Sequence, residues 1–224
     1  MGRGYRWLGG IGYILSLIPF VNIVGSILVG IGWIMAGNDT RNGIFKATGI
    51  VLLVTLILGI GLIGILFPFI GGVLMSGFMG LEPEFSPRLF SNLLQSLGLF
   101  ITLISGIAVL AIVGWVLELI SHFRASKVYN VKWFGRAGWM RIISLIVAII
   151  IVVFLVTQIS GLLGTLSFTD PRTILNTVFT SLSILIIPVI LNLIAIIFSA
   201  ISFFTIPETP VEESRKPPEL PPPP

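Results

Sequence analysis

The sequence predicts an all-α integral membrane protein with a short N-terminal helical hairpin and four transmembrane helices. Of the 224 residues, 55% are hydrophobic and 10% are charged, and the mean hydropathy is +1.09. This is more apolar surface than a water-soluble core of this length can bury. The apolar runs are continuous over about 20 residues, the length that a helix needs to cross a bilayer, and they lack the alternation of barrel strands.

We expect residues 1–206 to form a single multi-spanning membrane domain. Its predicted segments are a broken helix or hairpin at 8–36 and spans at 44–69, 97–120, 139–163 and 174–206. From residue 207 to 224 the composition changes to PETPVEESRKPPELPPPP. Such a segment cannot form a core, so a disordered, Pro-rich cytoplasmic tail is predicted.

A basic stretch at 121–141 fixes the predicted orientation. It contains Arg124, Lys127, Lys132, Arg136 and Arg141 and no acidic residue. A short basic loop between spans stays on the cytoplasmic side, where it also attracts anionic lipid headgroups. The sequence therefore predicts a multi-pass protein of the cell membrane, with the lipid bilayer and anionic headgroups as partners and no nucleic acid.

The first apolar run, 8–36, has two interpretations. As one helix it would be roughly 43 Å long against a hydrocarbon thickness of about 30 Å. Pro19 interrupts it, which allows either one tilted, kinked span or a re-entrant hairpin that turns back at Pro19. The hairpin is favoured because it returns Arg3 and Arg6 to the cytoplasmic side. Both termini are then cytoplasmic.

Two sequence matches suggest an internal repeat. GFMGLEPEFSPR (77–88) aligns with GLLGTLSFTDPR (161–172), and residues 45–49 are echoed by 134–138. These matches predict two parallel-related helical hairpins, 44–120 and 133–206. Convergent helix-start chemistry in a low-complexity sequence is the alternative.

The sequence offers little to hold a cofactor or a metal ion, and we predict neither. Gly59, Gly61 and Gly64 spell GxGxxG, but they lie inside an apolar run, so helix packing explains them better than dinucleotide binding. There is no cysteine and only one histidine, which disfavours a metal site.

Several polar residues interrupt the apolar segments. Glu118 and His122 are four residues apart, so they could form a pH-responsive pair; alternatively, Glu118 is a boundary carboxylate answered by Arg124 or another cation of the basic stretch. Embedded Asn22, Thr55, Gln158 and Asn192 could bond between helices or line a small polar pore.

Nothing in the sequence resembles a protease constellation or a phosphate loop, so we do not expect an enzyme. A structural or partner-binding role within the membrane is predicted, with a homo-oligomer or another membrane protein left open as the partner. The alternative is a small transporter or channel with a polar path near Asn192 and Gln158. A polar path would favour transport, whereas unpacked small-residue faces would favour assembly.

The segments LGGIG (8–12), IPFV (18–21) and IFKA (44–47), with Phe134 and the Ala-Gly pair at 137–138, resemble an uncharacterised family of small multi-spanning membrane proteins. This family is mainly archaeal and is catalogued as a domain of unknown function. The similarity covers about residues 6–206, whereas the long outer loops and the Pro-rich tail depart from the family pattern. The resemblance implies a location in the cytoplasmic membrane and no activity, substrate or catalytic residue.

Overall fold

A computed structural model of the chain describes residues 4–78, 87–165 and 183–208. Its helices are α1 (Tyr5–Leu15), α2 (Asn22–Asp39), α3 (Gly43–Phe78), α4 (Pro87–Val128), α5 (Lys132–Thr165) and α7 (Ile186–Phe204). The described residues form no strand, so the all-α prediction is confirmed. Within the described residues, four segments are long and apolar enough to cross a membrane, namely Gly43–Gly64, Ile101–Val128, Lys132–Thr157 and Ile186–Phe204.

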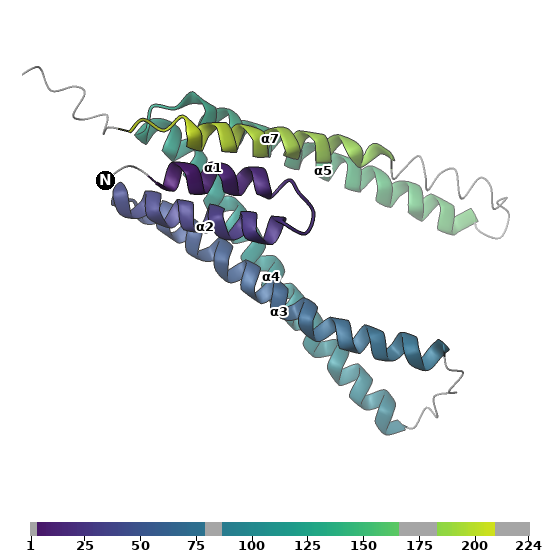
Figure 1. The fold of residues 1–224 in the computed structure, drawn as a ribbon. Helices are drawn as coiled ribbons and strands as arrows, with labels where there is room; N and C mark the ends of the chain where they lie inside the picture. The colour runs from purple at the N-terminus through teal and green to yellow at the C-terminus, as the bar shows by residue number, and fades with distance from the viewer. Residues whose placement is uncertain (1–3, 79–86, 166–182, 209–224) are drawn as a thin grey trace, which may run out of the picture.

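The helices pair into three hairpins, α1 with α2, α3 with α4, and α5 with α7 (Figure 1). Contacts also join α2 to α3, α4 to α5 and α7 to α1, so the helices form a closed ring. The two long hairpins meet where α1 begins and α7 ends, and they diverge toward the other side (Figure 1). We call the first side the closed end and the second the open end. The α1–α2 hairpin fills the space between the long hairpins at the closed end.

The N-terminal apolar run is a hairpin and not one kinked span. The chain leaves the helical conformation between α1 and α2, around Pro19, and Phe20 has a φ of 67°. Proline has no N–H to continue the helix and clashes with the preceding turn. The tip of this hairpin is apolar and exposed, with Ile18 47% and Phe20 96% accessible. An apolar tip suits a lipid environment better than water.

Glycine lets α1 and α2 approach closely. A Cβ atom on Gly25 would lie 2.5 Å from the backbone nitrogen of Ser16 and 2.7 Å from the carbonyl oxygen of Gly12. A Cβ atom on Gly12 would in turn lie 2.7 Å from the backbone nitrogen of Val29. Such contacts with backbone atoms leave no room for a side chain, so these glycines fix the spacing of the hairpin.

The basic stretch at 121–141 is mostly helical, which corrects the predicted loop. Helix α4 continues to Val128 and α5 begins at Lys132, so only residues 129–131 lie outside a helix. The reason is that these residues keep a helical period, with Ser121 and Ala125 buried while Arg124 and Lys127 are exposed. A helix with cations on its exposed face has the same polar composition as a loop, so composition alone does not distinguish the two.

The outer loop expected between the predicted spans 44–69 and 97–120 is also shorter than the sequence suggests. Helix α3 runs to Phe78, and α4 begins at Pro87, where the sequence predicts a helix start because a proline tolerates the first helical position. Three predicted features lie partly outside the described residues. These are the repeat matches 77–88 and 161–172, which fall outside at 79–86 and 166–172, the first part of the span predicted at 174–206, and the tail from 209 onward.

The core of the closed end repeats one pattern in the first helix of each hairpin. Tyr5 in α1, Phe45 in α3 and Phe134 in α5 are all at most 3% exposed. Each is followed four residues later by a glycine, namely Gly9, Gly49 and Gly138. The aromatic–glycine spacing that the sequence matches at 45–49 and 134–138 therefore recurs in the N-terminal hairpin.

The second helix of each hairpin supplies the matching aromatic layer. Trp33 in α2, His122 in α4 and Phe203 in α7 are fully buried. The ring of Trp33 lies 5.4 Å from that of His122 and 5.0 Å from that of Phe203, centroid to centroid. These side chains and the aromatic side chains of the first helices pack together in the centre of the helical bundle at the closed end.

Candidate functional site

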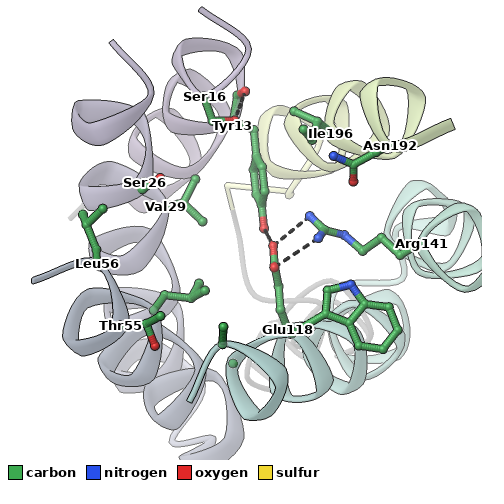
Figure 2. Close-up of a pocket in the computed structure, with 14 residues that line it drawn as sticks. Tyr13, Ser16, Ser26, Val29, Thr55, Leu56, Glu118, Arg141, Asn192 and Ile196 are labelled. Atoms are coloured by element: carbon green, nitrogen blue, oxygen red, sulfur yellow. Dashed lines mark hydrogen bonds and ion pairs between the residues drawn. The ribbon is translucent and has the colours of Figure 1, made fainter. Parts of the chain in front are cut away.

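A pocket of about 380 Å³ lies among the helices next to the tip of the α1–α2 hairpin (Figure 2). Every helix of the described ring contributes to its wall. Its polar lining residues are Tyr13, Ser16, Ser26, Thr55, Trp115, Glu118, Arg141 and Asn192, and its other lining residues are Val29, Leu52, Leu56, Ala111, Gly114 and Ile196. This volume is in the range of small-molecule sites.

A buried ion pair lies at the wall of the pocket (Figure 2). Arg141 Nη2 lies 2.8 Å from Glu118 Oε1, and Arg141 Nη1 lies 3.1 Å from Glu118 Oε2. The two side chains are 8% and 9% exposed. Two parallel charge-assisted hydrogen bonds of this kind are stronger and more directional than single ones. They join α5 to α4.

Neighbouring side chains extend this pair into a network. The hydroxyl of Tyr13 donates a hydrogen bond to Glu118 Oε1, and Trp33 Nε1 donates to the Tyr13 hydroxyl at 3.1 Å. On the other side, Ser199 Oγ lies 3.5 Å from Arg141 Nη2 and 2.9 Å from His122 Nε2. The network thus connects α1 and α2 to the two long hairpins.

The repeated pattern explains why Glu118 and Arg141 meet. Glu118 comes four residues before His122, just as Val29 comes four before Trp33 and Ser199 four before Phe203. These three residues are all buried. Arg141 follows Phe134 by seven residues, as Leu52 follows Phe45. Glu118 and Arg141 therefore lie on adjacent helices, in the layer of side chains that follows the aromatic layer on the side of the pocket.

Two donors of the pocket residues are unsatisfied within the described part of the chain. Arg141 Nε and Thr55 Oγ1 are buried and have no hydrogen-bond partner there. Buried polar groups are nearly always paired, so an unpaired one calls for an explanation. By contrast, the Ser16 hydroxyl donates to the Tyr13 carbonyl at 2.7 Å.

Glu118 and His122 do not pair through their side chains. His122 Nδ1 lies 2.7 Å from the backbone carbonyl oxygen of Glu118, to which it donates. The alternative prediction, a boundary carboxylate answered by Arg124 or another cation of the basic stretch, is right about the cation, which is Arg141. Glu118 is nevertheless not at the end of its helix, because roughly 15 Å of α4 separates it from Val128.

The other cations of the basic stretch stay at the surface of the closed end. Arg124, Lys127, Lys132 and Arg136 are exposed, and the guanidinium of Arg136 lies 4.4 Å from the centre of the Trp133 ring. Arg141 differs, since it is only 7% exposed. Counting Arg141 among the loop cations was therefore wrong, and its sequence position one turn beyond Ala137 was the available sign that it lies on the buried face of α5.

The predicted intramembrane polar residues have different surroundings. Asn192 lines the pocket (Figure 2). Asn22 is exposed at the start of α2, so its predicted place between helices is wrong, because the turn ends there and α2 presents Gly25 to α1 instead. Gln158 lies on α5, and its side chain is outside the described residues; roughly 25 Å of helix separates it from Arg141.

The glycines of the GxGxxG match do not pack closely against another helix within the described part of the chain. A Cβ atom on Gly59, Gly61 or Gly64 would meet nothing within 4 Å among the described atoms. Packing through these glycines inside the described chain is thus wrong, because α3 and α4 continue beyond the part of the ring that α1 and α2 fill (Figure 1).

The described residues contain no group of three or more His, Asp or Glu side chains that could hold a metal ion. The pocket instead offers hydrogen-bond donors, one ion pair and an apolar wall, which can bind and orient a small molecule.

No protein-family model, curated protein or solved structure matches the chain.

Proposed function

We propose that the protein is a small membrane transporter whose solute-binding site is the central pocket. The observation that carries this proposal is the buried Glu118–Arg141 pair at the wall of a cavity beside the tip of a broken helical hairpin. Ionisable residues inside membrane bundles are costly and usually mark a pathway for ions or solutes. Transporters commonly bind their substrates at the ends of discontinuous helices.

A purely structural role explains less of the site. A buried ion pair by itself is weak evidence for stability, since apolar residues of the same size often serve as well. A structural network would also fill the space beside it and pair its donors. Here a cavity remains next to Arg141, and both Arg141 Nε and Thr55 Oγ1 lack partners among the described residues.

The arrangement of the helices suits a pocket that opens to one side of the membrane at a time. The rings of Trp33, Phe134 and Phe203 pack together between the pocket and the closed end, and the long hairpins diverge toward the open end (Figure 1). Movement of the hairpins relative to one another would be needed to release a solute past the aromatic layer. Such rocking of repeated units is how many transporters work.

In this proposal the protein lies in the cell membrane with both termini and the closed end in the cytoplasm. The exposed cations Arg124, Lys127, Lys132 and Arg136 would then lie near anionic headgroups of the inner leaflet. The activity is transport and not catalysis.

Partner binding is the second candidate. It is favoured by the open glycine face of α3 at Gly61 and Gly64, where an added Cβ atom would meet nothing within 4 Å among the described atoms, because small residues allow helices of two chains to approach closely. The two roles are compatible, since transporters often assemble.

Reconstitution into liposomes tests the transport proposal. Ala111 lines the pocket, so Ala111→Trp should fill it, whereas Ile112→Trp adds the same side chain at a 63% exposed position. We expect at least one of a panel of labelled carboxylates, amines, amino acids and sugars to enter several-fold faster than into protein-free liposomes. Ala111→Trp should abolish this flux and Ile112→Trp should retain it. If no solute crosses faster than in protein-free liposomes, the transport proposal is wrong.

A further inference from the structure

We propose that the pocket binds a small carboxylate with an apolar body, and that Glu118 takes up a proton as the carboxylate binds to Arg141. This inference rests on the proposed transport function and names its substrate class and coupling ion.

The hydrogen-bonding capacity of the pocket favours an acceptor as the ligand. Glu118 is the only acid that lines it, and both of its oxygens already accept hydrogen bonds from Arg141, with a further one from Tyr13. An amine would thus find no vacant carboxylate. The buried groups of the lining that lack a partner among the described residues are the Arg141 Nε–H, which can only donate, and the Thr55 hydroxyl.

Arg141 is suited to a carboxylate in particular. Its Nη1 and Nη2 atoms bind Glu118 end-on, while the edge that carries Nε has no partner within the described chain except the long 3.5 Å contact from Nη2 to Ser199. A planar guanidinium edge matches the two oxygens of a carboxylate. Because Nε is buried, Arg141 must shift to present this edge, and it can do so only if its bonds to Glu118 loosen.

The rest of the pocket indicates a short apolar body. Val29, Leu52, Leu56 and Ile196 form its wall together with Ala111 and Gly114. A cavity of about 380 Å³ is at the small end of the range for ligand sites. The ligand would therefore be an aliphatic or aromatic acid of few carbons; a fatty acid from the bilayer shares this chemistry, and the experiment separates the two.

The buried charges around Arg141 must balance when a carboxylate binds, and this requires that Glu118 takes up a proton. Among the groups that face Glu118, Arg141 from α5 is the one cation, Tyr13 from α1 is a phenol, and His122 of α4 contacts the backbone carbonyl of Glu118. Trp33 and Ser199 supply uncharged contacts to this network from α2 and α7, and Thr55 is the uncharged α3 residue in the same pocket. A second anion next to Arg141 would leave an uncompensated buried charge. Protonation of a Glu118 oxygen by a proton from water removes that charge and releases Arg141 to the ligand.

Binding to the purified full-length chain in lipid nanodiscs tests the inference. The signal is the change in intrinsic tryptophan fluorescence, because Trp115, one of five tryptophans, lines the pocket. The probes are butyrate and benzoate, the matched amide and amine (butyramide and butylamine), and decanoate as the bilayer-derived class. We expect the short carboxylates to bind and the amide and amine to bind at least about tenfold more weakly. Carboxylate affinity should rise up to about tenfold per unit fall in pH between 7.5 and 5.5, as uptake of one proton requires.

Variants of the pair supply the second readout. Glu118→Gln resembles the protonated acid, so it should bind benzoate with little dependence on pH and at least about tenfold more tightly at pH 7.5. The neutral double variant Glu118→Gln/Arg141→Gln avoids an unpaired buried charge and should fold but lose carboxylate binding.

Tighter binding of butylamine than of butyrate, or unchanged pH dependence in a folded Glu118→Gln protein, would overturn the inference. Decanoate binding alone would assign the site to membrane lipid and overturn the water-soluble class. Flux of another solute that Ala111→Trp abolishes would leave the transport proposal standing in each of these cases.

Discussion

Arg141 of α5 and Glu118 of α4 lie 2.8 Å apart at their closest atoms, although 23 residues separate them in the sequence. They lie on either side of the short turn at 129–131, and Tyr13 of the N-terminal hairpin completes the contact. One ion pair thereby joins α4 to α5, and its contact with Tyr13 connects α1 to both. The stability of the fold and the properties of the pocket depend on the same two side chains.

Removal of one partner should destabilise the protein strongly. Glu118→Ala leaves the guanidinium of Arg141 buried without its carboxylate, and breaking a buried pair in this way costs about 3–5 kcal/mol. Thermal and denaturant unfolding in mild detergent should report a loss of this size. The double variant Glu118→Leu/Arg141→Leu removes both charges and should be more stable than Glu118→Ala.

Lys127→Ala is the matched control for this experiment. It removes a charge from the same region of α4, but Lys127 is exposed, so we expect a change of about 0.5 kcal/mol or less. Equal destabilisation by Glu118→Ala and Lys127→Ala would contradict the role assigned to the pair.

Glycine positions should separate into two classes. Gly25→Ala places a Cβ atom 2.5 Å from the Ser16 backbone nitrogen, so the hairpin must open, and we expect a loss of roughly 1–3 kcal/mol in the free energy of unfolding. Gly61→Ala meets nothing within 4 Å and gains helix propensity, so it should be neutral or stabilise by up to about 1 kcal/mol.

The comparison of Gly25→Ala with Gly61→Ala also tests assembly. Destabilisation by Gly61→Ala together with a change in oligomeric state would show that this glycine face is covered by a second chain. No change in either property would argue against that use of the face.

The features that follow from local physics were predictable from the sequence. Continuous apolar runs predict helices of membrane length, and Pro19 together with the positions of Arg3 and Arg6 predicts a hairpin. The structure agrees on both the helices and the hairpin. Ser86 and Pro87 likewise predicted the start of α4 at Pro87.

The site was not predictable in the same way, because it depends on contacts between distant residues. Arg141 looks like one more cation of a basic stretch, and only the burial of the α5 face beside α4 separates it from Arg136. The recurrence of the aromatic–glycine spacing in the N-terminal hairpin was also missed, although Tyr5 and Gly9 repeat the spacing of Phe45 and Gly49. A tyrosine in place of phenylalanine and a much shorter hairpin obscure that match.

The aromatic layer should behave as a core even though the protein is apolar outside. Phe45 and Phe134 are fully buried, so Phe45→Ala and Phe134→Ala should each cost about 3–5 kcal/mol through lost contacts and a cavity. Ile150→Ala serves as the control, because Ile150 is 62% exposed on α5 and loses few protein contacts. Unfolding in one detergent compares the three variants. A cost for Ile150→Ala that equals that of Phe134→Ala would mean that this part of α5 is covered by another chain.

Cysteine labelling tests the threading directly, since the chain contains no cysteine. Gly4 and Ser126 belong to the closed end of the bundle, next to the beginning of α1 and the end of α4. We expect Gly4→Cys and Ser126→Cys to react with a membrane-impermeant maleimide only from the cytoplasmic side, because the hairpin returns the N-terminus to that side. Phe20→Cys at the 96% exposed tip of the hairpin should resist the reagent from both sides, because a tip that ends within the bilayer is out of reach of an impermeant reagent.

Ser86→Cys, in the outer loop predicted from the sequence, provides the external control. Labelling of Gly4→Cys from the external side, with Ser126→Cys still labelled from the cytoplasm, would mean that residues 8–36 cross the membrane once, and the proposed position of the pocket within the bilayer would then be wrong.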